Sequence, residues 1–446
     1  MTATVAWSYQ LLDQDEQRAF RSFGALPGLF PIDAAAEVLA GREAAPAGCH
    51  DALRAAAQLM DKSLLLRSET SVVATCPLYY MLETVRAYAA RELAMSGKRD
   101  DAMEGLVRYC TREAALAAEG LAGPGQVKWL DRVREDLESY RGALAWLIDH
   151  DRPAEATDIA VGLMFFWIIR GHAAEGFRWY EQILNLSSLP PVVESGALLG
   201  SGAMANSLGD IEHARTALAR ALALAHGTGD KAIVALAEYL LGRVEHALGH
   251  VDAAREHCAQ SLEQFRALAV AWGIGSWLTG MAAAHLATGD LAAAERLLDE
   301  GTAVLRPVGP WFLALALGVR AILAVQRGNA DESIAIVRES LTLIRGLHDN
   351  HAFVFALGPL AVAAMLKGDA AWAARILGAR DAVSERTRAS FGVRQSLDNL
   401  TGLGEREVRA RLGPDRWAAA YAAGRQMSID SLFTDIDNAL ANRGRA

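Results

Sequence analysis

The chain has 446 residues, of which 52% are hydrophobic and 22% are charged, and its formal net charge is −9. This composition supports a large hydrophobic core and excludes a disordered chain. The acidic balance does not suit a protein that mainly wraps nucleic acid, because such a protein needs a basic surface.

The cysteines and the apolar stretches bear on the compartment. Four cysteines, Cys49, Cys76, Cys110 and Cys258, form no CxxC pair, which indicates a reducing compartment and no structural zinc site. Residues 1–20 are polar and acidic, unlike a signal peptide. The longest uncharged apolar stretches, 159–169 and 352–366, are too short to cross a bilayer. We therefore expect a cytoplasmic protein with no membrane contact.

Residues 1–95 predict a small module of helices and one hairpin. An amphipathic helix over 11–23 places Leu12, Phe20 and Phe23 on one side, and "PGLF" at 27–30 ends it. We expect a second helix over 32–40 with Asp33 as its cap, and a third over 50–63 capped near Asp51.

A hairpin and a further helix complete this module. The β-rich stretch 63–74 predicts a hairpin with residues 68–70 in the turn. Residues 79–94 predict a helix whose apolar stripe is Met81, Val85, Tyr88 and Leu93. Three helices followed by a hairpin is the order of a winged helix.

A winged helix raises the hypothesis of direct DNA binding, in which the third helix would read bases. That helix offers Arg54 and Lys62 against Asp51 and Asp61. The run Ala55–Ala57 has no side chain that hydrogen-bonds to base edges. Residues 1–100 also hold 10 Lys or Arg against 12 Asp or Glu. A packing module is the favoured interpretation.

Residues 96–150 predict a helical linker that contains "GPGQVK" at 123–128. Its glycines and lysine suggest a phosphate loop, but no strand precedes it, so we do not assign a phosphate site there.

An internal repeat governs residues 151–390. A glycine followed by an Ala-rich helix recurs at spacings of 38, 40, 40, 39 and 40 residues. The six glycines are Gly171, Gly209, Gly249, Gly289, Gly328 and Gly368. Five residues after them stand Gly176, Ala214, Ala254, Ala294, Ser333 and Ala373, and nine after them stand Tyr180, Leu218, Cys258, Leu298, Val337 and Leu377. Seven before them stand Met164, Gly202, Gly242, Ala282, Ala321 and Ala361.

This pattern predicts helical hairpins. The glycine ends the first helix in a left-handed conformation, and the residue after it, Asp in three repeats, caps the second helix. Small residues on both sides of the turn let the two helices approach closely. Since one hairpin cannot bury its own apolar face, the hairpins stack into an α-solenoid. A period of about 40 residues allows longer helices than a standard tetratricopeptide repeat. The alternative is a non-repeating helical bundle.

We therefore predict an all-α fold, a tetratricopeptide-like α-solenoid with an N-terminal winged-helix-like module and a helical C-terminal cap. The expected domains are 1–95 for the module, 96–150 for the linker, 151–390 for the solenoid and 391–446 for the cap.

These motifs resemble a known family, the bacterial STAND ATPases (signal transduction ATPases with numerous domains) that act as LuxR-type and AfsR-like transcriptional regulators. In the module the matching motifs are "WSYxLL" (Trp7 to Leu12) with Glu16 and Phe20, "PGxF" (27–30), "DKSL" (61–64) and "LETVRAYA" (82–89). Downstream they are 123–146, where Ser139 stands in place of an expected Asn, 373–383 and 412–430.

The resemblance implies the part of such a regulator that follows its ATPase domain, a winged helix and then a tetratricopeptide-like superhelix. No GxxxxGK[ST] phosphate-binding loop occurs in the 446 residues, and no basic helix-turn-helix follows residue 430. The resemblance implies a nucleotide-binding domain as a partner, in cis or in trans.

No catalytic, cofactor-binding or metal-binding residue is assigned. HExxH and GxSxG motifs are absent. His246 and His250, with His257 nearby, raise the alternative of a metal site, but Gly249 interrupts their helix. Trp272, Trp277 and Trp311 favour packing between repeats over a ligand-binding box.

The sequence thus predicts no enzyme and no cofactor. The leading hypothesis is a regulatory and sensory module that works by protein–protein contact. The alternatives are a regulator that binds DNA through its own winged helix, and a binder of a small effector molecule.

Overall fold

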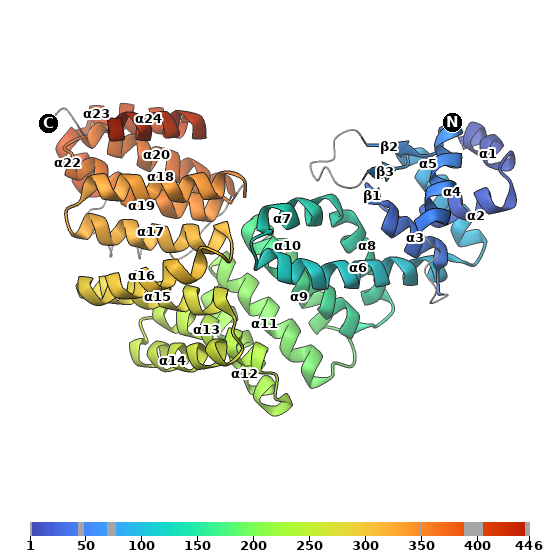
Figure 1. The fold of residues 1–446 in the computed structure, drawn as a ribbon, viewed down its shortest axis with the longest axis horizontal. Helices are drawn as coiled ribbons and strands as arrows, with labels where there is room; N and C mark the ends of the chain where they lie inside the picture. The colour runs from blue at the N-terminus through green and yellow to red at the C-terminus, as the bar shows by residue number, and fades with distance from the viewer. Residues whose placement is uncertain (1, 43–48, 69–76, 348, 388–404, 442–446) are drawn as a thin grey trace. The chain divides into compact units, whose positions relative to one another are not determined.

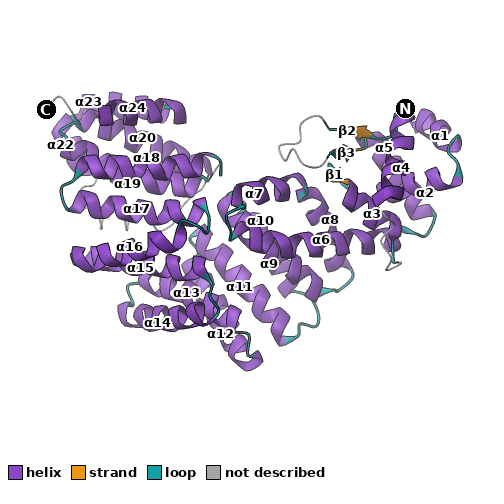
Figure 2. Cartoon of the chain, viewed as in Figure 1, coloured by secondary structure: helices purple, strands orange, loops and turns teal. Residues whose placement is uncertain are grey.

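The computed structural model describes residues 2–42, 49–68, 77–347, 349–387 and 405–441, and these are almost entirely α-helical (Figures 1 and 2). The chain forms two compact units. The first combines Met1–Gly120, Val127–Met164 and Glu181–Leu189, and the second combines Leu121–Gln126, Phe165–Tyr180 and Pro190–Ala446. The predicted fold class, an all-α solenoid with a winged-helix-like module and a helical cap, is confirmed.

The N-terminal module is built from five helices and a small sheet. Its elements are α1 (Thr2–Gln10), α2 (Gln14–Phe23), β1 (Phe30–Pro31), α3 (Ile32–Ala40), α4 (Cys49–Asp61), β2 (Leu66–Arg67), β3 (Leu78–Tyr80) and α5 (Glu83–Met95). The sheet is antiparallel, with β3 between β1 and β2. A capping box starts α2, in which the Asp13 carboxylate accepts from the Glu16 N–H at 2.8 Å and Glu16 accepts from the Asp13 N–H. The helix predicted from residue 11 begins only at Gln14, so Leu12 precedes α2 and Phe20 and Phe23 lie on it, and all three predicted apolar side chains are buried.

The predicted cap of the second helix is wrong, and the cap position of the third helix lies outside the described residues. Pro31 holds the N-cap position of α3, and Asp33 lies inside the first turn, where its carboxylate accepts a hydrogen bond from the Cys49 thiol. The chain passes directly from β1 into α3, so the helix begins before Asp33 can cap it. Asp51 likewise lies within the first turn of α4 and pairs with Arg54 at 3.0 Å.

The predicted start of the last module helix is also wrong. Residues 78–80 form β3, and α5 begins only at Glu83. Tyr79 pairs with Phe30 in β1 and with Arg67 in β2, so the short tyrosine run is held by strands distant in sequence. The Ser68–Thr70 turn and the second strand predicted for 63–74 fall largely on residues 69–76, which lie outside the described residues.

Long helices follow the module: α6 (Arg99–Leu121), α7 (Gln126–Glu135), α8 (Leu137–Asp149), α9 (Pro153–Ile169) and α10 (Ala173–Leu184). Within the first unit, α6 packs tightly against α3. A Cβ on Gly105 would lie 2.1 Å from the Glu37 carbonyl oxygen, so only glycine permits this contact. Glu37 also pairs with Arg108 and Arg112 of α6, which fixes the module against this helix.

Five hairpins stack in sequence order in the second unit (Figure 1). They are α11 (Pro191–Leu208) with α12 (Ile211–Thr228), α13 (Lys231–Ala247) with α14 (Val251–Ala267), α15 (Ala271–Thr288) with α16 (Leu291–Leu305), α17 (Pro310–Gln326) with α18 (Ala330–Arg345), and α19 (Asn350–Leu366) with α20 (Ala370–Thr387). Helices α9 and α10 form one more hairpin, which comes first in the chain and brings the number to six. The boundary between the two units falls inside both of these helices.

The left-handed turn glycine is confirmed in all six hairpins, and the Asp cap in the three hairpins that carry it, whereas His250 makes no side-chain cap hydrogen bond at the start of α14. The six repeat glycines have positive φ angles between 74° and 82°. Asp210, Asp290 and Asp369 each accept a hydrogen bond from the backbone N–H three residues further on, as the capping prediction requires. The small residues also lie where predicted: a Cβ on Gly202 would come within 2.6 Å of Leu218, and one on Gly242 within 2.7 Å of Cys258.

The C-terminal cap consists of α22 (Glu405–Leu412), α23 (Pro414–Arg425) and α24 (Ile429–Ala441). Gly378 of α20 and Gly424 of α23 let the two backbones approach, since a Cβ on Gly424 would lie 1.9 Å from the Arg375 carbonyl oxygen. Helix α24 buries Leu432 and Ile436, and its Asp430 and Asp437 pair with Arg345 and Arg338 of α18.

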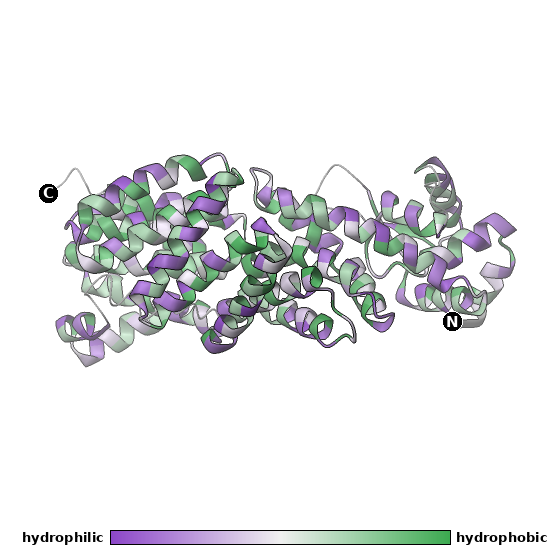
Figure 3. Cartoon of the chain, turned by 90° about the horizontal axis from the view of Figure 1, so that it is seen from below, coloured by the Kyte–Doolittle hydropathy of each residue, from purple (hydrophilic) through white to green (hydrophobic). Residues whose placement is uncertain are grey.

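Apolar and polar residues alternate along most helices, as Figure 3 shows by hydropathy. Across the part of the chain that the structure describes, no helix has both the length and the apolar character needed to pass through a membrane.

Candidate functional site

The helix that a winged helix would use to read DNA is α4. Ala55 and Ala56 are buried, and they pack inside the module. Arg54 is paired with Asp51, and Lys62, just after the helix, pairs with the buried Glu16 carboxylate. Both cations of this segment are therefore engaged within the module, which weakens the interpretation of α4 as a base-reading helix.

The module also exposes large apolar side chains. Trp7 is 63% exposed, Leu11 62% and Met95 74%, and Leu53 and Leu82 are exposed too. Trp7 and Leu11 belong to the "WSYxLL" motif, in which the neighbouring Tyr9 packs on Phe20 and Tyr88. Within this motif the Tyr9 ring therefore stabilises the module, whereas the Trp7 and Leu11 side chains face solvent.

The histidines that suggested a metal site form separate pairs with carboxylates. His257 Nδ1 lies 2.5 Å from Glu238 Oε2, and His250 Nδ1 lies 2.6 Å from Glu245 Oε2. Among the described residues no group of three or more His, Cys, Asp or Glu side chains could hold a metal ion. The histidines were identified from the sequence but their carboxylate partners were not, although a position-by-position comparison of the repeats would have found them.

The aromatic residues of the solenoid form a cluster across several hairpins. Phe165 of α9 contacts Trp272 of α15 at 5.1 Å between ring centroids, and Trp311 and Phe312 of α17 at 6.4 and 5.5 Å. Trp272 also contacts Phe265. Phe165 of the first hairpin thereby touches the hairpins three and four repeats further along. The tryptophans of this cluster were identified from the sequence, and the phenylalanines were not.

The indole N–H groups of two of the three tryptophans donate hydrogen bonds within the solenoid. Trp311 Nε1 donates to Asp349 Oδ2 at 2.6 Å. Trp277 Nε1 donates to the carbonyl oxygen of Cys258 on the preceding helix. Trp272 is half-buried in the aromatic cluster. These environments agree with packing between repeats rather than with a ligand-binding box.

The "GPGQVK" segment has a structural role as well. The Gln126 side chain is fully buried, donates to the Leu121 carbonyl oxygen and accepts from the Trp311 N–H at 2.8 Å. The amide of Gln126 thus satisfies a backbone N–H in the first turn of α17, which has no intrahelical acceptor.

A buried polar cluster lies among α6, α7 and α8 of the first unit. Tyr109 OH donates to Asp136 Oδ2 at 2.7 Å, and Arg132 pairs with Glu113 at 2.5 Å. Burial raises the pKa of Asp136 to about 7, against the opposing effects of Tyr109 and Arg132. Asp136 is therefore a carboxyl group that changes charge close to neutral pH.

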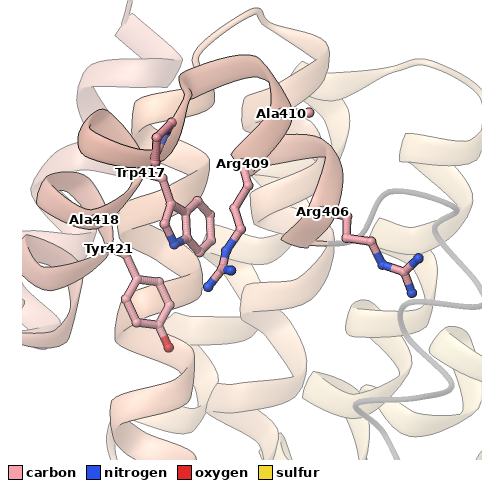
Figure 4. Close-up of a pocket in the computed structure, with 7 residues that line it drawn as sticks. Arg406, Arg409, Ala410, Trp417, Ala418 and Tyr421 are labelled. Atoms are coloured by element: carbon pink, nitrogen blue, oxygen red, sulfur yellow. The ribbon is translucent and has the colours of Figure 1, made fainter.

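One pocket of about 620 Å³ lies in the cap, between α22 and α23 (Figure 4). Its walls include Arg406, Arg409, Trp417 and Tyr421. The Arg409 guanidinium lies over the Trp417 ring at 4.9 Å and pairs with Glu405, so its positive charge is balanced within the cap. In Figure 4 the Arg406 side chain extends away from Trp417 and Tyr421.

These features define a helical-repeat protein with a winged-helix-like module, whose notable side chains serve packing or internal pairing. No family model matches the chain. Proteins named "Putative HTH-type transcriptional regulator" from Mycobacterium bovis and Mycobacterium tuberculosis are 26% identical to it over 349 residues, which is 76% of this chain. The chain spans 38% of the length of these relatives.

Two solved structures match most of this chain at low similarity. One is a STAND protein with a tetratricopeptide repeat sensor from Pyrococcus horikoshii, which matches 97% of this chain and 66% of its own at 12% identity and a TM-score of 0.46. The other is a chain of the APC/C hetero-tetramer Cut9–Hcn1, which matches 91% of this chain and 83% of its own at 12% identity and a TM-score of 0.37. The resemblance stated from the motifs is confirmed as a similarity to proteins named as HTH-type transcriptional regulators.

Proposed function

We propose that the chain is a non-enzymatic regulatory and sensory module that acts by protein–protein contact, as the repeat-bearing part of a STAND-type transcriptional regulator in the cytoplasm. The stacked hairpins support this proposal most directly, because repeat solenoids offer long surfaces that suit protein partners. Similarity to transcriptional regulators supports the regulatory context. The division into 1–95, 96–150, 151–390 and 391–446 remains part of the proposal.

The N-terminal module is the surface that we propose for a nucleotide-binding domain, supplied in cis or in trans. The exposed Trp7, Leu11 and Met95 side chains support this role, since large exposed apolar groups often mark interaction sites. Direct DNA binding has less support, because Arg54 and Lys62 are paired within the module. For a small effector, the cap pocket is a candidate site.

Site-specific crosslinking in cells tests the proposal. A photoreactive amino acid at position 7 should give a crosslink to a polypeptide that carries a nucleotide-binding domain, identified by mass spectrometry. The same group at Ala287, an exposed position at the end of α15, is the matched control and should not give that crosslink. Equal crosslinking from both positions, or none from position 7, would contradict the proposed surface.

A mobility-shift experiment addresses the DNA alternative. The purified chain should not shift duplex DNA at low salt, where phosphate contacts are strongest. A salt-dependent shift that is lost in an Arg54→Ala variant would replace protein contact by DNA binding as the role of the module.

A further inference from the structure

The third of the six hairpins, α13 with α14, departs from the repeat at positions that are apolar in the other hairpins of the second unit. Eleven residues before the turn glycine, the hairpins α11–α12, α15–α16, α17–α18 and α19–α20 carry Leu198, Leu278, Leu317 and Leu357, and α13 carries Glu238. Eight residues after it, they carry Ala217, Leu297, Ile336 and Ile376, and α14 carries His257. A leucine and an aliphatic residue of the common core are thus replaced by an acid and a histidine.

A second carboxylate stands two helical turns further along the same face of α13. Glu245 lies four residues before the turn glycine, where three other hairpins carry Ala205, Ala324 and Ala364. Glu238 is 2% exposed and Glu245 is 4% exposed, so both carboxylates are in the interior of the hairpin. Buried carboxylates are costly unless they are paired.

The two carboxylates have different partners. Glu245 accepts from Arg215 Nε at 2.6 Å and lies 2.6 Å from His250 Nδ1. Burial acts to raise the pKa of Glu245, but the hydrogen bonds from Arg215 and His250 outweigh it and lower this pKa. Because arginine remains charged at every relevant pH, Glu245 keeps a cation when His250 is neutral.

Glu238 depends on a partner that titrates. Its carboxylate lies 2.5 Å from His257 Nδ1, and this hydrogen bond raises the pKa of His257 against the opposing effect of burial. When His257 loses its proton, the buried carboxylate faces a neutral imidazole in place of a cation. A buried charge that loses its counter-charge destabilises the surrounding packing.

Other charged groups on the neighbouring helices do not replace this proton. Glu245 and Glu256 are both acidic and strengthen the protonated form of His257. Arg243 of α13 lies over the Tyr239 ring at 5.9 Å. Elsewhere, α11 carries Glu194, paired with Arg220 of α12; α12 carries Arg215, paired with Glu245; and α15 carries His285, 3.4 Å from Asp290. The ends of α13 carry Lys231 and His246, and Cys258 of α14 is half-buried.

We propose that the α13–α14 hairpin is a pH-responsive joint of the solenoid, tightly packed while His257 is protonated and loosened when it is neutral. The folded pKa of His257 is raised, so this pair stabilises the hairpin fully below the ordinary histidine pKa and the stabilisation is lost as pH rises through the raised value. Since each hairpin contacts its neighbours, loosening here alters how the repeats on either side are held together.

Hydrogen exchange of the full chain at pH 6 and pH 8.5 tests the joint. After correction for the intrinsic exchange rate, amides of α13 and α14 should lose protection at least several-fold at the higher pH, because the buried Glu238 carboxylate then lacks its counter-charge. Amides of α19 and α20 serve as the internal control and should keep their protection. Equal protection of α13 and α14 at both pH values would overturn the proposal.

Variants separate the two carboxylates. The double variant Glu238→Leu with His257→Leu installs the residues of the next hairpin, Leu278 and Leu297, and should give protection that no longer depends on pH. His250→Gln is the matched control: Glu245 retains Arg215, so the pH response should persist. His257→Gln keeps a side-chain donor and removes the titration, so its protection should also be independent of pH. A response that survives in both position-257 variants would refute the role of His257.

Discussion

At the scale of single residues, the interior of this chain contains groups whose charge depends on their surroundings. Asp136 is the clearest example in the first unit, because burial raises its pKa from an ordinary value of 3.8 to about 7. The folded chain therefore holds a proton at Asp136 over a range in which the unfolded chain has lost it. The contribution of Asp136 to the free energy of unfolding is therefore fully present below its ordinary pKa and declines as the pH rises towards 7.

Replacing Asp136 by Asn should remove that decline. The free energy of unfolding of the wild type should fall relative to the variant by about 1.4 kcal/mol for each pH unit between 4 and 7. Urea unfolding monitored by circular dichroism at several pH values measures the difference. Asp415→Asn, at an exposed position of α23, should show no such trend. A constant difference between wild type and D136N would show that Asp136 does not titrate as described.

Ala294 tests packing at the same scale. It is fully buried in a cluster with Ala282, Leu286 and Leu298, where α15 and α16 meet. Ala294→Trp should destabilise the chain by about 1–3 kcal/mol or more, because the site has no room for an indole. Ala287→Trp, at an exposed site of α15, is the control. Equal melting temperatures of the two variants would contradict the assigned repeat register.

At the scale of elements, glycine has two separate roles in these hairpins. Gly289 ends α15 with a φ of 80°, a conformation that residues with a Cβ adopt only at a cost. Gly280 lies inside the same helix with open space around its missing side chain. The first glycine is needed by the turn, and the second weakens the helix relative to alanine.

The two substitutions to alanine should therefore change stability in opposite directions. Gly289→Ala should lower the free energy of unfolding by about 1–2 kcal/mol, and Gly280→Ala should raise it by up to about 1 kcal/mol. Thermal unfolding of both variants and of the wild type measures whether each substitution lowers or raises the melting temperature. If both variants melt at a lower temperature, the space described around Gly280 is wrong.

At the scale of the whole molecule, the chain presents repeats and a module without a phosphate-binding loop. Phosphate binding of the P-loop kind needs a glycine-rich row of backbone N–H groups with a lysine. The one segment that resembled such a loop, 123–128, instead uses Gln126 to bond the Trp311 N–H. We expect the 446-residue chain alone neither to bind ATP or ADP at micromolar affinity nor to hydrolyse ATP.

Calorimetric titration of the purified chain with MgATP measures this expectation directly. No saturable heat should develop at micromolar concentrations, and a matched titration with MgADP should give the same result. Saturable binding would reveal a nucleotide site that neither the motifs nor the described residues indicate.

The repeats were predictable from sequence because their determinants are local. A glycine with positive φ, a following Asp and small residues at fixed offsets specify one hairpin turn, and all six glycines adopt the predicted conformation. The burial of Phe20 and Phe23 follows from helical periodicity in the same way.

Short elements were less predictable, since their pairing comes from residues distant in sequence. Tyr79 and Tyr80 fit a helix or a strand equally well, and only β1 and β2 select the strand. Asp33 has the chemistry of a cap, yet α3 begins at Ile32, directly after the β1 pairing of Pro31.

By itself, the sequence determined the all-α repeat fold, the hairpin turns, the helical face of each repeat and the resemblance to transcriptional regulators. Tertiary structure decided which groups meet: Glu238 with His257, Gln126 with the Trp311 backbone, and Phe165 with aromatic rings three to four hairpins away. The reason is physical. Turn and periodicity signals act over a few residues, whereas these contacts join positions 19 to 185 residues apart and depend on how successive hairpins stack.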